Sequence, residues 1–121
     1  MGQNYKSFLY MLPQKITAKQ LSIIPDFLSP KQIEVWTELN LLEITLADGT
    51  ITFEDMMENL TGEADKALLA SMQVEQVYVC DYEEADCVQV QELIKCLLKS
   101  AGGFLASDTE DFKPFLKAEE L

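Results

Sequence analysis

Residues 42–53 read LEITLADGTITF, and this stretch contains the clearest local pattern in the chain. Apolar side chains occupy every second position on both sides of Asp48-Gly49: Leu42, Ile44, Leu46, Ile51 and Phe53. An Asp-Gly pair between two alternating runs is a strong signal of a β-hairpin, because both residues tolerate the positive φ of a tight turn. The stretch therefore predicts two antiparallel strands, with Gly49 in the left-handed region.

Upstream of this hairpin, the pattern predicts one strand and two short helices. Residues 7–12 alternate loosely and predict a strand, and residues 18–24 predict a short helix. Ser29-Pro30 provides a capping residue followed by proline at the first helical position. Apolar residues follow this cap at spacings of three and four, so a helix is predicted over 30–39.

Downstream of the hairpin, helical and strand patterns alternate. A helical pattern after Phe53 is expected to end at Gly62 and to continue over 63–72, and 74–82 is rich in strand-forming residues. Residues 84–101 form the longest amphipathic pattern, which Gly102-Gly103 ends. A strand is predicted over 104–106, and Ser107 or Asp108 is expected to cap a last helical segment that contains Phe112, Phe115 and Leu116.

This order of elements predicts a single α+β domain over residues 1–121. The first six elements match the ferredoxin-like βαββαβ alternation, and a C-terminal αβ unit would extend the sheet. We expect the helices to lie mainly on one face. The last strand–helix–strand unit is expected to contribute a pair of parallel neighbouring strands joined by a right-handed crossover.

The charge of the chain is large, negative and uneven. Its 121 residues include 21 carboxylates and nine basic residues, for a net charge of −12, and every basic residue is a lysine. Residues 40–94 hold thirteen of the carboxylates and a single lysine, Lys66. A field of this sign repels nucleic acid and anionic lipid and accelerates encounter with a basic partner. The simpler alternative is a charged surface that only keeps the protein soluble.

The composition also argues against most enzymatic and metal chemistry. The chain lacks histidine, the commonest general base and metal ligand, and arginine, the preferred clamp for phosphate. Residues 48–55 resemble half of a calcium loop, but Ile44 and Leu46 would occupy positions that need oxygen ligands. Cys80, Cys87 and Cys96 have no metal-type spacing and are expected to be reduced, buried small residues. We therefore predict no enzyme activity, no metal and no cofactor.

A short acidic run is the candidate partner-binding site. Four carboxylates fall within residues 81–86, where a strand gives way to a helix. They could form a binding face for a basic protein, a divalent-metal nest or an acid pair, and the simpler alternative is that they only cap that helix. Tyr78, Cys80 and Tyr82 share one face of the strand, and the tyrosines would be exposed if the opposite face were the core. The residues expected to contact a partner are Asp81, Glu83, Glu84, Asp86, Glu54, Asp55, Glu58 and Tyr82.

These observations predict a cytoplasmic, non-enzymatic module that binds a basic protein. One concrete form is an inhibitor of the immunity type, which neutralises a basic toxin or nuclease. The alternatives are an acidic secretion chaperone or adaptor, a nucleic-acid mimic, and a carboxylate- or cysteine-dependent enzyme. We expect a monomer or weak dimer that binds neither nucleic acid nor membrane.

Overall fold

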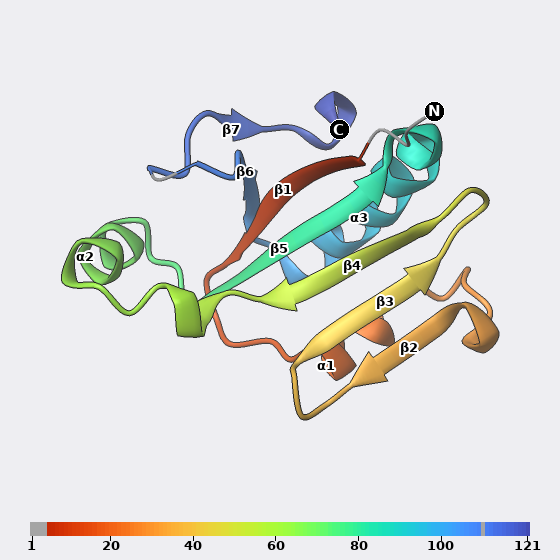
Figure 1. Ribbon diagram of the computed structural model, residues 1–121, viewed down its shortest axis with the longest axis horizontal. Helices are drawn as coiled ribbons and strands as arrows, with labels where there is room; N and C mark the ends of the chain where they lie inside the picture. The colour runs from red at the N-terminus through yellow and green to blue at the C-terminus, as the bar shows by residue number, and fades with distance from the viewer. Residues whose placement is uncertain (1–4, 110) are drawn as a thin grey trace.

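The computed structural model describes residues 5–109 and 111–121, and its centre is a seven-stranded antiparallel sheet in the order β2-β3-β4-β5-β1-β6-β7 (Figure 1). The strands are β1 (Tyr5–Leu12), β2 (Ile33–Trp36), β3 (Leu41–Thr45), β4 (Thr50–Asp55), β5 (Gln76–Glu83), β6 (Phe104–Ala106) and β7 (Phe115–Leu116). Three α-helices join them within the described residues: α1 (Ala18–Ser22), α2 (Glu63–Ser71) and α3 (Cys87–Ala101). The predicted α+β class and the 42–53 hairpin are confirmed.

The strand order differs from the one that the sequence suggested. The expected ferredoxin-like order is not confirmed, and the expected parallel neighbours are absent from the described sheet, in which every pair of neighbouring strands is antiparallel. Strands β5 and β6, which flank α3, run parallel to each other but are separated by β1. The departure is that β5 lies between β4 and β1, so that β1 pairs with β5 and β6. The residues of β1 from Phe8 to Leu12 are all buried, and a strand that is apolar on both faces is favoured inside a sheet.

Three local predictions were wrong. The helix expected over 30–39 is a short 3₁₀ turn, η1 (Pro30–Gln32), followed by β2. The Ser29 cap is present, with the Ser29 hydroxyl accepting from the Lys31 N–H at 3.3 Å, but it starts only this turn. Gly62 precedes α2 instead of ending a helix, and η2 (Met57–Asn59) occupies the preceding segment. The last helical segment is replaced by β7 and by η4 (Ala118–Glu120).

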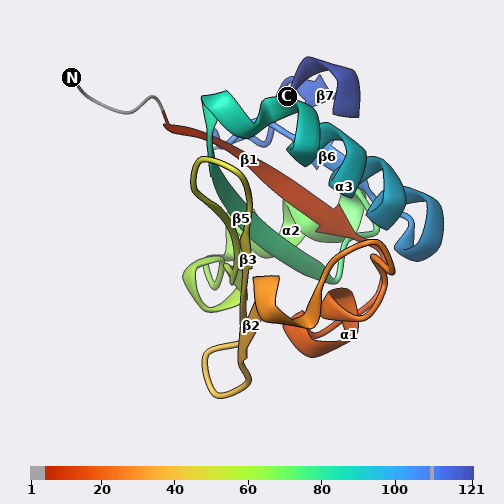
Figure 2. The same cartoon turned by 90° about the vertical axis from the view of Figure 1, so that its right-hand side faces the viewer.

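One face of the sheet is covered by α1 and α3. Figure 2 shows both helices on the same side of the strands, and in Figure 1 they lie behind the sheet. The main apolar core between these layers includes Phe8, Phe53, Tyr78 and Tyr82. The tyrosines of β5 are thus buried rather than exposed. Burial of Tyr82, which is only 1% exposed, raises the pKa of its hydroxyl to about 12.

The other face is only partly covered. A second core joins Leu9, Met11 and Val77 of the central strands to Leu69 of α2 and to Phe112. Helix α2 lies at the end of the sheet where β4 ends and β5 begins (Figure 1). This core contains no residue of β2, β3 or β4, so within residues 5–109 and 111–121 no second core covers the other face of those strands.

A polar network attaches the β2–β3 turn to the rest of the sheet. Asn40, at a positive φ of 49°, accepts a hydrogen bond from the Ala18 N–H through Oδ1 at 2.7 Å. Its Nδ2 donates to Asp55 Oδ2 at 2.9 Å and to the Tyr78 hydroxyl at 3.0 Å. The Tyr78 hydroxyl in turn donates to the Ile16 carbonyl. These bonds fix the start of α1 and the end of β4 against the central strand.

The hairpin turn is held by the start of α3. The N–H groups of Asp48 and Gly49 donate to Asp86 Oδ1 and Oδ2, each at 2.9 Å. The Ala47 N–H donates to Gln89 Oε1 at 3.1 Å. Gly49 is not among the residues with positive φ, so the predicted reason for glycine here was wrong. Its Cβ would instead lie 2.6 Å from Cγ of the buried Glu83, which leaves no room for a side chain.

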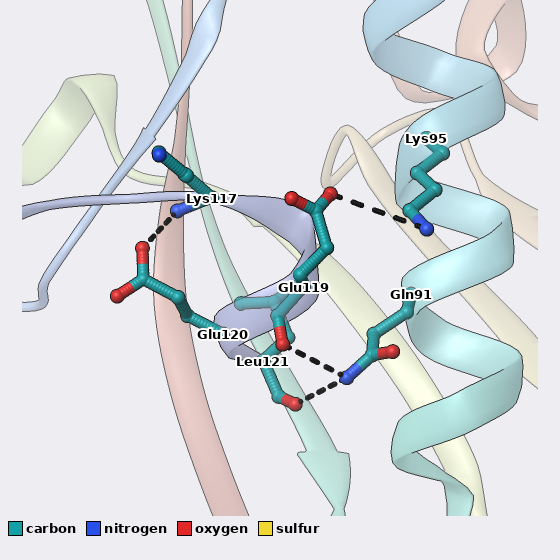
Figure 3. Close-up of polar contacts among 6 residues, drawn as sticks. All are labelled: Gln91, Lys95, Lys117, Glu119, Glu120 and Leu121. Atoms are coloured by element: carbon teal, nitrogen blue, oxygen red, sulfur yellow. Dashed lines mark hydrogen bonds and ion pairs between the residues drawn. The ribbon is translucent and has the colours of Figure 1, made fainter.

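The C-terminal segment packs against α3 (Figure 3). Gln91 Nε2 donates to the main-chain oxygen of Leu121 at 2.9 Å and to that of Glu119 at 3.4 Å. Lys95 lies 4.0 Å from the Glu119 carboxylate, and both side chains are largely exposed. An exposed pair of this kind contributes little stability, so Gln91 and the buried Leu121 are the main attachments of η4.

Replacing Asp86 by alanine is expected to destabilise the fold. The substitution removes both acceptors of the turn, and hydrogen bonds to a charged group contribute roughly 1.5–3 kcal/mol. We expect a loss of about that size in the free energy of unfolding, measured by urea denaturation. The matched control is Glu84→Ala, at an exposed position of the preceding turn η3 (Glu84–Asp86), which should change stability by less than about 0.5 kcal/mol. Equal effects of the two substitutions would contradict this role of Asp86.

Candidate functional site

The open face of β2, β3 and β4, together with the adjoining end of β5 at Asp81, presents a row of carboxylates. Strand pairing places Glu34 opposite Glu43, Glu43 opposite Thr52, and Thr52 opposite Asp81. Because side chains alternate between faces, these residues point away from the core that holds Ile33, Val35, Leu42 and Ile44. The next row on the same face contains Trp36, Leu41, Glu54 and Val79. We call the side chains of Glu34, Trp36, Glu43, Glu54 and Asp81 the acidic face.

The charges of the acidic face are not balanced by local cations. Strands β2, β3, β4 and β5 contain no lysine. Across the described parts of the chain, the one ion pair is Lys95–Glu119, which belongs to α3 and η4. Glu34 and Glu43 are direct cross-strand neighbours, and like charges in that arrangement destabilise a sheet. The acidic face therefore concentrates charges of one sign, with no ion pair to any of its carboxylates among the described residues.

The pKa of the Asp81 carboxyl reflects this environment. Partial burial raises the pKa of its carboxyl above the ordinary value, and the charges of Asp108 and Glu54 raise it further. Asp108 belongs to the loop after β6, so carboxylates from three separate segments approach one another at this end of the acidic face. A cation placed here would favour the charged form of Asp81.

A groove lies near the same end of the acidic face. It has a volume of about 640 Å³ and runs between η2, α2 and the loop after β6. Its apolar lining includes Met56, Leu60 and Phe112, and Asp65 and Asp108 also line it. The groove therefore extends the negative surface beyond the strands.

The structure brings together only some of the predicted partner-binding residues. Glu54 and Asp81 share the acidic face, while Glu58 and Glu84 are exposed in separate 3₁₀ turns. Asp55 is half-buried and accepts hydrogen bonds from Asn40 and from the Met57 N–H. The remaining three predicted residues are buried within the fold: Tyr82, Glu83 and Asp86.

Sequence reasoning missed Glu34, Glu43 and Trp36. Glu34 and Trp36 were assigned to a helix, which hid the alternation of Ile33 and Val35 with Glu34 and Trp36. Glu43 lay in the correctly predicted hairpin, on the face opposite Leu42 and Ile44. Its importance follows from the pairing with β2, which the sequence pattern did not reveal.

The three cysteines differ in exposure: Cys80 is buried as predicted, whereas Cys87 and Cys96 are only half-buried. Cys80 is fully buried, and burial raises the pKa of its thiol well above the ordinary value, which disfavours the nucleophilic thiolate. Within residues 5–109 and 111–121, no three Cys, Asp or Glu side chains are grouped so that they could hold a metal ion. No helix in the described part of the chain is long and apolar enough to cross a membrane. What the acidic face can do chemically is attract and bind cationic groups.

Comparison with known proteins adds no family. No protein-family model matches the chain, and searches of curated proteins and of solved structures found no significant match.

The Asp81→Asn substitution is expected to stabilise the fold at neutral pH. A raised pKa means that the folded state favours protonated Asp81, so its contribution is most favourable below the ordinary pKa of about 4 and is lost as pH rises through the raised value. The variant should therefore be more stable than the parent at pH 7, and this advantage should vanish near pH 3. Urea denaturation at both pH values measures it.

Asp26→Asn is the control for this experiment, because Asp26 is exposed in a loop far along the chain from the acidic face. It should leave stability unchanged at both pH values. If Asp81→Asn increased the free energy of unfolding as much at pH 3 as at pH 7, the effect would not come from the charge of Asp81.

Proposed function

We propose that this protein is a non-enzymatic module that binds a basic protein, and that the acidic face is its contact surface. The observation that carries the proposal is the row of Glu34, Glu43 and Asp81, with Glu54 beside it, on strands without a lysine. Glu43 is half-buried, and the other three are exposed. A surface of one sign steers an oppositely charged partner toward it and raises the association rate.

The repulsion within the acidic face supports a binding role. Like charges that face each other across strands reduce stability, so they are costly in the free protein. A cationic partner would offset this repulsion on binding, and the relief would add to the affinity. A purely solubilising surface needs no such crowding, because charges of both signs spread over the surface serve solubility as well.

The form of this function that we favour is a stoichiometric inhibitor of the immunity type. Such an inhibitor needs only a preformed surface complementary to the basic site of its target. Nucleic-acid mimicry is less well supported, because a mimic needs evenly spaced charges. The row here places Glu34 and Glu43 on adjacent strands, about 5 Å apart, and is then interrupted by Thr52 before Asp81.

One observation favours the secretion chaperone or adaptor as a second candidate. A groove of about 440 Å³ lies between α3 and the segment before β2, lined by Phe27, Leu28, Leu46, Val88 and Leu93 among others. Phe27 and Val88 are 57% and 67% exposed. An adaptor would use such apolar surface, whereas the inhibitor would use the acidic face. Partner binding that is lost in Phe27→Ser/Val88→Ser but kept after charge reversal on the acidic face would favour the adaptor.

Charge reversal on the acidic face should slow association with a basic partner. The test compares Glu34→Lys/Glu43→Lys with a control of identical net charge, Asp26→Lys/Glu75→Lys, whose positions are exposed elsewhere. With a partner purified from the native host, we expect the first variant to associate about tenfold more slowly at low salt and the control to resemble the parent. The difference should shrink at high salt, because screening removes steering. Surface plasmon resonance measures both rates.

Two results would contradict the proposal. One is equal slowing by both double variants, which would mean that net charge matters and its location does not. The other is a partner whose association is insensitive to salt and to both variants. Urea denaturation of each variant shows whether its fold is intact before the rates are compared.

A further inference from the structure

Trp36 lies within the acidic face, although a tryptophan would ordinarily be placed in the core. It is the single tryptophan of the chain and is 38% exposed. Its neighbours Ile33 and Val35 pack against the main core, so the alternation of β2 directs Trp36 to the open face. In the described residues the ring pairs are Phe8–Tyr82 and Phe104–Phe115, and Trp36 belongs to neither. With 38% of its surface exposed, Trp36 is partly accessible.

Carboxylates share the open face with Trp36 at neighbouring register positions. Glu34 is two residues away on β2, at a Cα separation of about 7 Å, and Glu43 lies opposite Glu34 on β3. Glu54 stands opposite Leu41, the cross-strand partner of Trp36. An aromatic ring with carboxylates on two neighbouring strands is a surface that suits a planar cation, which can stack on the ring and donate hydrogen bonds at its edge.

Arginine fits this arrangement better than lysine. The guanidinium is planar, is more weakly hydrated than an ammonium group and donates two parallel hydrogen bonds to a carboxylate. It can thus stack on Trp36 while bonding to Glu34 or Glu43. A lysine ammonium is a point charge that would satisfy the carboxylates without using the ring face as well. Strand β2 is at the edge of the sheet, so no further strand obstructs approach to Trp36.

We propose that Trp36, Glu34 and Glu43 form a subsite for one arginine side chain of the partner protein. The inference rests on the proposed function, because it assigns the partner chemistry recognised at one part of the acidic face. It makes a separate claim, since general attraction to basic proteins would not distinguish arginine from lysine.

The probe is a blocked tripeptide, acetyl-Gly-Arg-Gly-amide, compared with its lysine analogue of equal charge. Fluorescence of Trp36 reports binding directly, because the chain has no other tryptophan. We expect the arginine peptide to change the emission with a midpoint about two- to fivefold lower than that of the lysine peptide, as an exposed cation–π contact would give. The equal charge of the two peptides keeps the ionic strength matched during titration.

Variants separate the ring from the carboxylates. Glu34→Gln/Glu43→Gln should weaken binding of both peptides, while the control Asp26→Asn/Glu75→Gln should bind both as the parent does. Trp36→Leu, followed by amide chemical shifts in NMR spectra because the fluorophore is lost, should bind the two peptides equally and weakly. The NMR spectrum also shows whether each variant remains folded.

The outcomes distinguish this inference from the proposed function. Equal midpoints for the two peptides in the parent protein, or an arginine preference that survives in Trp36→Leu, would overturn the subsite. If both peptides bind equally and both are lost in Glu34→Gln/Glu43→Gln, the arginine subsite fails while the acidic face retains its role. Both proposals fail if Glu34→Gln/Glu43→Gln leaves the binding of both peptides unchanged and if charge reversal on the acidic face leaves the association rate of the partner unchanged.

Discussion

The architecture depends on the burial of β1 on both of its faces. From Phe8 to Leu12 every side chain is buried, and alternate residues face two different cores. A strand of this kind needs a neighbour on each side and a layer above and below. The first layer, made by α1 and α3, spans most of the sheet. The second, made by α2 and the loop after β6, covers the central strands and leaves β2, β3 and β4 open. The acidic face lies mainly on this uncovered part of the sheet.

The sequence predicted those elements whose periodicity is long and consistent. The 42–53 hairpin and α3 each contain enough residues for the period to be unambiguous. Strand β2 has four residues, too few for alternation to outweigh a genuine capping signal at Ser29-Pro30. The place of β1 inside the sheet agrees with its continuous apolar run from Phe8 to Leu12, which a search for alternation alone did not use, whereas its neighbours β5 and β6 are set by tertiary packing. The turn at Gly49 was predicted, but Gly49 does not have the positive φ that was given as the reason for glycine there.

The candidate site was predictable only in part, because it is built from strand pairing. Asp81 and Glu54 were expected from charge density alone, and both lie on the acidic face. The neighbouring Asp86 has the same charge but accepts two backbone hydrogen bonds, so charge density cannot separate a surface residue from a structural one. Glu34 and Glu43 became partners only once β2 and β3 were paired. Sequence separation of the acids therefore says little about which of them act together.

The position of β2 at the sheet edge also has a consequence for contacts between copies of the chain. An edge strand offers unpaired backbone groups to which another strand can add, and proteins limit such growth with charged side chains at the edge. Here Glu34 projects from the edge strand itself, with Glu43 immediately behind it. Two copies aligned through β2 would bring four glutamates of one sign together across the new junction. The charges that would attract a cationic protein thus also hinder growth of the sheet into an extended ribbon.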